Sequence, residues 1–185
     1  MREIERKWII TEEKSEPTTI LNNKDFWKGT VWEHAKRCDL SIEQKYVRFG
    51  CPEIRVRKVF NNDTCESTYY MFIKTDTDAM IERDEQIICI DEDDFDRIIE
   101  DYVIRKDRVE MISADENIPN LMIDNFSVDL SELAMIEIEF SSREQAEEFV
   151  LPHQVTDLFE VREVTDDPRY RNSYLAQHAE REVID

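Results

Sequence analysis

The sequence predicts a mainly antiparallel β fold, either a barrel or a sandwich, with a few helices inserted between the strands. Short runs in which charged and apolar residues alternate recur along the 185 residues, and this alternation is typical of strands with two different faces. Two of these runs flank Asn61-Asn62-Asp63, which is typical of the turn in a β-hairpin. A hydrophobic content of 41% is enough for a core, so we expect one domain over residues 1–185.

The runs expected to form strands carry apolar residues, many of them β-branched or aromatic, in alternation with charged ones. In chain order they are residues 2–10, 41–49, 53–60, 68–74, 81–90, 103–112, 121–128, 134–140 and 160–165. So many short strands in one chain need closure into a barrel, or a second sheet, to bury their apolar faces.

A helical period replaces the strand pattern at residues 91–102. Apolar residues there fall on one helical stripe, and the acidic residues before them suit the positive end of a helix dipole. The stripe consists of Phe95, Ile98, Ile99 and Tyr102. We expect this helix to pack on the outside of a barrel.

Three further segments are expected to be helical or irregular. Ser142 is expected to cap a helix that continues to residue 150 and ends before a proline. Residues 168–179 are expected to form a terminal helix. Residues 26–36 are expected to form a helix or a loop, with their two tryptophans either in the core or at the edge of a lid.

The charge balance excludes several classes of partner. The chain has 24 Lys and Arg residues against 44 Asp and Glu residues, a net charge of -20. Nucleic acids and anionic membranes are therefore not expected partners, because binding to them depends on basic side chains that neutralise phosphate. No apolar run approaches the roughly 18 residues of a membrane span, and the N-terminus lacks the apolar core of a secretory signal, so we expect a cytoplasmic location.

The cysteines and glycines restrict the kinds of site that the chain can form. The cysteines have wide spacings and no Cys-x-x-Cys pair, which predicts reduced thiols and no zinc site. They are Cys38, Cys51, Cys65 and Cys89. Only two glycines occur, which excludes a glycine-rich phosphate loop and a dinucleotide fingerprint. Any phosphate site must therefore consist of side chains.

The first strand carries a candidate site. Glu3, Glu5 and Lys7 follow one another at a spacing of two, so in a strand they share one face. Adjacent carboxylates repel each other unless water or a cation lies between them. A divalent metal with an anionic ligand would use both signs of charge, although a solvated strand face is the simpler explanation of this segment alone.

Charged doublets with the same spacing recur in later strands. They are Arg55/Arg57, Arg83/Glu85, Lys106/Arg108 and Glu137/Glu139, and the single Lys74 adds to them. A wet strand face explains any one doublet. Several strands with only acids or only bases instead indicate a barrel whose polar face points inward, with bases for a polyanion and acids for metals.

These motifs resemble those of the CYTH domains, also called triphosphate tunnel metalloenzymes. Glu3-Ile-Glu5-Arg-Lys7 resembles the family's N-terminal Glu-x-Glu-x-Lys. The other motifs follow in the family's order over nearly the whole chain. They are Ile42-Glu-Gln44-Lys-Tyr46, Arg55-Val-Arg57, Phe72-Ile-Lys74, Arg83-Asp-Glu85, Lys106-Asp-Arg108, Asp124-Asn-Phe126, Glu137-Ile-Glu139-Phe and a closing segment from Glu163 to Leu175.

The chain departs from the family pattern at a few positions. Ile87 stands where the family often has a second glutamate, which is expected to weaken one metal position. Lys45 stands where a glycine is usual, and is expected to narrow the tunnel or to add a phosphate contact. The glycines usual after Asp-x-aromatic are absent. These departures leave the exact substrate open.

The resemblance implies an α+β protein, mainly antiparallel β, with an eight-stranded closed tunnel barrel and helices packed outside. It also implies metal-dependent hydrolysis of a triphosphate, namely tripolyphosphate, a nucleoside triphosphate or thiamine triphosphate, with Mg²⁺ or Mn²⁺ as cofactor. The physical chemistry agrees, because a triphosphate carries about four negative charges and needs matching cations when it is enclosed. Oligomeric state is left open between monomer and homodimer.

The resemblance also assigns roles to residues. The phosphate-binding residues would be Arg55, Arg57, Lys74, Arg83, Lys106 and Arg108. The metal ligands would be Glu3, Glu5, Glu85, Asp124, Glu137 and Glu139, and the catalytic residues Lys7, Glu137 and Glu139. Structural roles are expected for Tyr46, Tyr170 and Asn172, while Arg169 either faces the tunnel mouth or pairs with Asp166 and Asp167.

Two other functions fit the same motifs. An adenylate cyclase would convert ATP to cyclic AMP and pyrophosphate, with the ribose hydroxyl as nucleophile. A non-catalytic protein would only bind a triphosphate or polyphosphate. Ile87 keeps the second alternative open, whereas the acids of the first and eighth expected strands argue against it.

Overall fold

The computed structural model describes residues 2–13, 27–76, 82–99, 101–115, 117–127 and 130–178. Four residues at the edges of expected elements lie outside these ranges, namely Phe26, Ile81, Val128 and Ala179. No helix among the described residues is long and apolar enough to cross a membrane.

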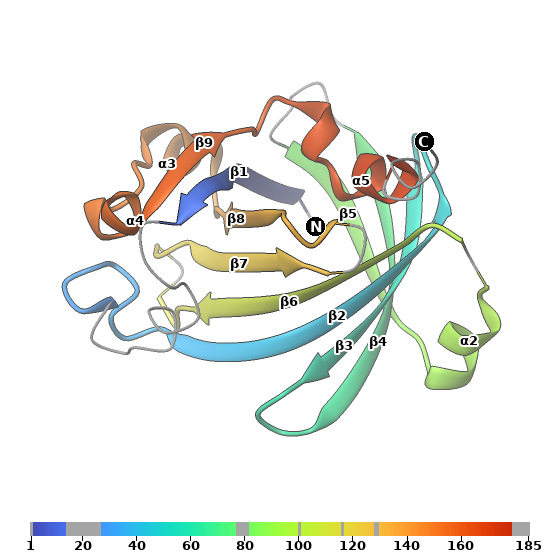
Figure 1. The fold of residues 1–185 in the computed structure, drawn as a ribbon. Coiled ribbons are helices and arrows are strands. Elements are labelled where there is room, and N and C mark those ends of the chain that lie inside the picture. Colours follow the sequence, from blue (N-terminus) through green and yellow to red (C-terminus); the bar gives the residue numbers. More distant parts are fainter. Residues whose placement is uncertain are drawn as a thin grey trace.

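The described strands form one nine-stranded antiparallel sheet (Figure 1). The strands are β1 Arg2–Glu13, β2 Lys36–Arg48, β3 Glu53–Asn61, β4 Glu66–Asp76, β5 Glu82–Cys89, β6 Val103–Ile112, β7 Asn120–Phe126, β8 Ala134–Glu139 and β9 Phe159–Glu163. Their order is β5-β4-β3-β2-β6-β7-β8-β1-β9, and β1 also pairs with β5. The β1–β5 pairing closes the first eight strands into a barrel, as the sequence predicts, and β9 is added to β1.

Strand β1 has two different neighbours along one edge. Its first residues pair with β5 through Arg2↔Asp84, Glu3↔Arg83 and Ile4↔Glu82, and its second half pairs with β9 from Trp8 onward. Strand β8 follows its other edge. Among the described residues the barrel therefore closes through three residue pairs, and Glu3 lies at this seam.

The described helices are short and lie outside the barrel or across its end. They are α2 Glu92–Arg97, α3 Arg143–Glu148, α4 His153–Leu158, the 3₁₀ helix η3 Pro168–Tyr170 and α5 Asn172–His178. In Figure 1, α3 and α4 lie on the left beside β9, and α5 lies on the right. Ser142 caps α3 as predicted, because its side chain accepts a hydrogen bond from the Gln145 backbone NH.

Three helix predictions need correction. The helix expected over residues 91–102 ends at Arg97, since Ile98 has an extended conformation and only Phe95 of the stripe is buried, while Ile99 is 88% exposed. The helix after Ser142 ends at Glu148, and α4 follows it without having been predicted. The terminal helix is divided into η3 and α5 because Arg171 between them is extended.

The main hydrophobic cluster lies outside the barrel wall. It joins the outward side chains of β1, β7 and β8 to α3, α4 and residues 27–35. Trp27 and Trp32 are 3% and 0% exposed there, which places both in the core rather than at the edge of a lid. The outer face of these strands is therefore mainly apolar, and their charged doublets face the barrel interior.

A second hydrophobic cluster fills one end of the barrel interior. It contains inward residues of five strands together with Ala176 of α5. The strand residues are Ile9, Tyr46, Ile104, Phe126 and Met135. We call this cluster the apolar plug, and it leaves the rest of the interior for the charged side chains.

Candidate functional site

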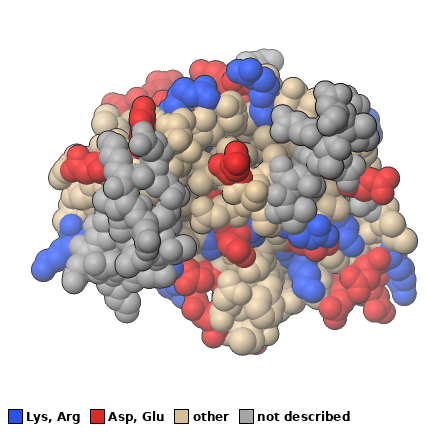
Figure 2. Space-filling view, viewed as in Figure 1, with Lys and Arg blue, Asp and Glu red and all other residues tan. Residues whose placement is uncertain are grey.

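A cavity of about 280 Å³ lies inside the barrel, near the lower end of the range for small-molecule sites. Inward side chains of β1, β3, β4, β5, β6, β7 and β8 line it, together with the segment from Val164 to Ser173. Seven of the chain's 24 Lys and Arg residues lie there, beside a similar number of acids. The net negative charge therefore belongs to the rest of the chain, and Figure 2 shows acidic and basic side chains interspersed on the outer face in view.

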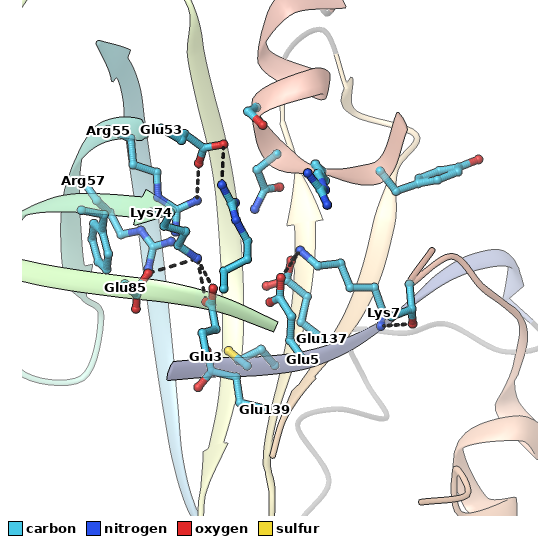
Figure 3. Close-up of a pocket in the computed structure, with 18 of the residues that line it drawn as sticks. Glu3, Glu5, Lys7, Glu53, Arg55, Arg57, Lys74, Glu85, Glu137 and Glu139 are labelled. Atoms are coloured by element: carbon cyan, nitrogen blue, oxygen red, sulfur yellow. Dashed lines mark hydrogen bonds and ion pairs between the residues drawn. The ribbon is translucent and has the colours of Figure 1, made fainter. Parts of the chain in front are cut away.

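Most of the predicted site residues meet in this cavity (Figure 3). They are Glu3, Glu5, Lys7, Arg55, Arg57, Lys74, Arg83, Glu85, Arg108, Glu137 and Glu139. The cause is the two-residue period of strands, which turns the members of every doublet to the same face. Neighbouring strands then align them, as in the cross-strand pairs Lys7↔Glu137 and Glu5↔Glu139.

Lys106 and Asp124 do not line the cavity. Both side chains are 0% exposed, and the Lys106 ammonium donates a hydrogen bond to Asp124. The same carboxylate accepts hydrogen bonds from Arg108 Nε at 2.6 Å and Nη2 at 2.7 Å. Asp124 therefore holds the guanidinium of Arg108 in place through two hydrogen bonds. Burial and the positive charge of Arg108 lower the pKa of Lys106 to about 8.

Ion pairs connect Arg108 to Glu137 and Glu137 to Lys7 inside the cavity. Arg108 Nη2 donates to Glu137 Oε2 at 2.6 Å, and Lys7 Nζ donates to Glu137 Oε1 at 3.0 Å. Burial would raise the pKa of Glu137, but Lys7, Lys106 and Arg108 outweigh it and hold that pKa well below its ordinary value. Burial would lower the pKa of Lys7, but Glu137 and Glu5 outweigh it, so Lys7 keeps its proton and supplies positive charge.

Three glutamates form an acidic side of the cavity, namely Glu3, Glu5 and Glu139. Lys74 Nζ donates to Glu3 at 2.7 Å, and Lys7 Nζ lies 3.0 Å from Glu5. Within the described part of the chain the Glu139 carboxylate has no hydrogen bond or ion pair. Burial, reinforced by the charges of Glu3 and Glu5, raises the pKa of Glu139 to about 7.

Arg55 and Arg57 form a basic side, to the left of the glutamates in Figure 3. Arg57 Nε donates to Gln44 at 2.8 Å, and its guanidinium lies 4.5 Å from the centre of the Phe72 ring. Burial and the charges of Arg55 and Arg108 lower the pKa of Arg57 to about 10. Arg55 Nε is buried and meets no acceptor among the described residues. This side therefore carries more positive charge than its own acids balance.

The acidic side suits a divalent cation in its chemistry. Carboxylate oxygens are the ligands that Mg²⁺ and Mn²⁺ prefer, and a cation would relieve the repulsion from Glu3 and Glu5 that adds to burial in raising the pKa of Glu139. Among the described residues, however, no three acids converge into a metal-binding group. The ammonium groups of Lys74 and Lys7 hold Glu3 and Glu5 instead, so a metal would need these two lysines to turn away.

The cavity also contains residues without a predicted site role. Glu53 begins β3 and lies 3.5 Å from Arg83 and 3.9 Å from Arg55. It stands two positions before Arg55, so the strand period extended by one step would have identified it. Asn172 was expected to be structural, yet its side chain lines the cavity while 7% exposed, and its Oδ1 has no hydrogen-bond donor among the described residues.

Three of the sequence expectations are resolved by side-chain contacts. Lys45 does not enter the tunnel, because its Nζ donates to the backbone carbonyls of Phe95 and Ile98 at 3.0 Å and so binds the end of α2. Arg169 pairs with Asp167 at 2.6 Å and does not line the cavity. Tyr46 packs in the apolar plug, which agrees with the structural role expected for it.

Comparison with solved structures shows a shared fold. The chain is similar to the crystal structure of the inorganic triphosphatase NE1496, with 24% sequence identity, a TM-score of 0.53, and coverage of 94% of this chain and 93% of that one. It is also similar to PH1819 from Pyrococcus horikoshii OT3, with 19% identity, a TM-score of 0.50, and coverage of 78% and 81%. These likenesses confirm the tunnel fold that the resemblance to CYTH domains implies.

A similar fold also occurs in a chain of a multiprotein assembly. A chain of the Schizosaccharomyces pombe Mediator head module matches with 8% identity, a TM-score of 0.50, and coverage of 85% of this chain and 89% of that one. No protein-family model and no curated protein matches the sequence. Function must therefore be argued from the residues of the cavity.

Proposed function

We propose that this chain hydrolyses a phosphoanhydride bond of a triphosphate inside the barrel, with a divalent cation. The observation that carries the proposal is the division of one cavity into an acidic side and a basic side. Burial and the charges of Glu3 and Glu5 raise the pKa of Glu139 to about 7 at the acidic side, and burial and the charges of Arg55 and Arg108 lower the pKa of Arg57 to about 10 at the basic side. In a metal-bound polyanion, the metal supplies the positive charge that the acidic side lacks, and the polyanion supplies the negative charge that the basic side lacks.

The basic side would bind the phosphates. Arginine presents paired NH donors that match two phosphate oxygens, and the Nη groups of Arg57 make no hydrogen bond with another described residue. Arg108 is held rigid by Asp124 and Glu137, so it presents a fixed positive charge to the substrate. Lys7 stays protonated and would stabilise negative charge that develops on the reacting phosphate.

The acidic side would hold the cation, through Glu3, Glu5 and Glu139, with Glu85 and Glu137 beside them. When bound, Mg²⁺ or Mn²⁺ offsets phosphate charge and acidifies a bound water. The residues of the chain contribute the carboxylates and, once Lys74 and Lys7 turn away, two ammonium groups free to contact phosphate oxygens. The buried walls exclude bulk water, which strengthens each of these charge contacts.

A non-catalytic triphosphate-binding protein remains a second candidate. The observation that favours it is the absence of a three-acid metal group among the described residues, with the lysines in its place. Such a protein would bind the polyanion at the basic side and release it unchanged.

One assay separates hydrolase, cyclase and binder. Purified protein is incubated with Mg²⁺ or Mn²⁺ and with tripolyphosphate, ATP or thiamine triphosphate, and the products are identified. We expect orthophosphate release that stops when the cation is chelated. Pyrophosphate with cyclic AMP would indicate a cyclase, and binding without product would indicate the second candidate.

A further inference from the structure

One part of the cavity lining is apolar. Strand β5 presents Arg83, Glu85 and then Ile87 to the interior, and Ile87 is 48% exposed although it lines the cavity. Its cross-strand partner on β4 is Phe72, and Tyr70 lies two positions further along the same face with the two ring centres 6.1 Å apart. We call Phe72 and Ile87, which line the cavity, together with Tyr70, which adjoins Phe72 without lining it, the apolar strip.

The apolar strip begins where the basic side ends. The guanidinium of Arg57 covers the Phe72 ring at 4.5 Å and that of Arg55 lies 5.0 Å from it. Phe72 itself is 6% exposed, so exposure increases along the strip from the arginines toward Ile87. A phosphate held by Arg57 would therefore have charged neighbours on one side and apolar side chains on the other.

This arrangement discriminates between two kinds of triphosphate. Inorganic tripolyphosphate is charged at both ends, so an end placed against Phe72 and Ile87 loses water without gaining a partner. A triphosphate ester carries an organic group at one end, and that group gains from burial against the strip. An aromatic heterocycle can also pack against Ile87 and the edges of the two neighbouring rings.

We propose, on the basis of the function proposed above, that the substrate is an organic triphosphate whose aromatic group packs on Tyr70, Phe72 and Ile87. Ile87 is then a specificity-determining residue that favours esters over inorganic tripolyphosphate. Tyr70 lies about 7 Å beyond Phe72 along the strand, which extends the strip far enough to contact a heterocycle as well as the sugar or linker next to the phosphates.

The test compares two isoleucines that are adjacent in sequence. Ile87→Ala removes apolar surface from the cavity, whereas Ile88→Ala removes the same side chain from the opposite face of β5, where it is 45% exposed. For each variant, kcat/KM is measured with ATP, thiamine triphosphate and tripolyphosphate, and the affinity for an ATP analogue with a β,γ-imido bridge is measured by calorimetry.

We expect Ile87→Ala to reduce the ratio of kcat/KM for the preferred ester to that for tripolyphosphate about tenfold, and to weaken binding of the analogue by a similar factor. Ile88→Ala should leave both quantities at the wild-type value. Equal ratios in the two variants, or a wild-type preference for tripolyphosphate over both esters, would overturn this inference and leave the hydrolase standing. Release of no product from any of the three compounds would overturn the hydrolase and the inference with it.

Discussion

At the scale of single residues, the cavity contains charges that the fold does not balance. Glu139 lies across from Glu5 in the strand pairing, and Arg57 lies beside Arg55 and near Arg108. Like charges directly opposite each other in a sheet are destabilising, so these positions cost stability in the absence of a ligand. Residues that reduce stability in this way are good candidates for ligand contacts.

Glu139→Gln should therefore separate stability from ligand binding. We expect the metal-free variant to melt a few degrees higher than the wild type, because removal of one of three like charges is worth about 1 kcal/mol and 1 kcal/mol is about 2–4 °C in a chain of this size. We also expect Mg²⁺ to stabilise the wild type but not the variant. Thermal melts with and without Mg²⁺ measure both effects, with Glu160→Gln on the exposed part of β9 as control.

If Mg²⁺ stabilises Glu139→Gln and the wild type equally, the glutamate does not contribute to a metal site. The same outcome would count against the acidic side as a whole, because Glu139 is the member of that group whose carboxylate no lysine holds.

Arg57→Ala should weaken substrate binding more than it slows the reaction. Loss of charged hydrogen bonds to phosphate costs about 1.5–3 kcal/mol, so we expect KM to rise about 10- to 100-fold with a smaller change in kcat. Steady-state kinetics measure the two constants. Lys58→Ala removes a positive charge from the next position of β3, on the outer face of the barrel, and should leave KM unchanged.

At the scale of elements, one arginine joins three of them. Arg6 Nη1 of β1 donates to the carbonyls of Ala146 and Phe149 at 2.8 Å, at the end of α3. Its Nε and Nη2 donate to Glu163 of β9 at 2.8 and 2.7 Å. This guanidinium therefore holds α3 and β9 against β1, the strand that carries Glu3, Glu5 and Lys7.

Arg6→Lys should lower stability without changing the charge. A lysine cannot reproduce this four-bond geometry, so we expect a loss of about 2 kcal/mol, or about 4–8 °C in melting temperature. Arg48→Lys, at an exposed position of β2, is the matched control and should melt with the wild type. Similar melting temperatures for all three proteins would show that the guanidinium does not hold these elements together.

The contact between Arg6 and Glu163 also gives a pH dependence. The hydrogen bond from Arg6 holds the pKa of Glu163 below its ordinary value of 4.5. The stability from this pair is therefore present above about pH 4.5 and is lost as the pH falls through the lowered pKa. Melting temperatures from pH 7 to pH 3 should show a smaller acid loss in Glu163→Gln than in the wild type, and parallel curves would contradict the assignment.

The strands could be predicted from the sequence, whereas the helices could be predicted only in part. Alternation of charge and apolarity places β6 at residues 103–112 without error and most other strands to within a few residues. The stripe of residues 91–102 has helical spacing, but only Phe95 of its members is buried, against the ring of Tyr69, while Tyr102 lies beyond the helix and packs on Phe49. A helix needs burial of its apolar face, and that depends on neighbours that local spacing does not describe.

At the scale of the whole molecule, the barrel separates two kinds of interior. The apolar plug closes one end, and the charged cavity occupies the space beside it. The outside of the wall made by β1, β7 and β8 is the main hydrophobic core, so the charged doublets of β1 and β8 face the interior, while Arg6 of β1 binds the elements outside. This arrangement explains how acidic and basic side chains come to line a cavity inside the barrel.

The strand period shows which residues face inward, but it does not show how deep they lie. Lys106 and Arg108 belong to one doublet, yet Lys106 lies next to the apolar plug with Asp124, while Arg108 reaches the cavity. Depth depends on the stagger of neighbouring strands, which follows from closure of the barrel. Asn172 was beyond the same method because it reaches the cavity from α5 and not from a strand.

We propose that the acidic side and the basic side of this cavity act together on a metal-bound triphosphate. Orthophosphate release from ATP, thiamine triphosphate and tripolyphosphate, measured with Mg²⁺, with chelator, and in Glu139→Gln, tests it most directly. We predict release that requires the cation and falls at least about tenfold in the variant, the loss typical of one charge contact in a transition state. Release of equal rate in all three conditions, or no release from any of the compounds, would contradict the account.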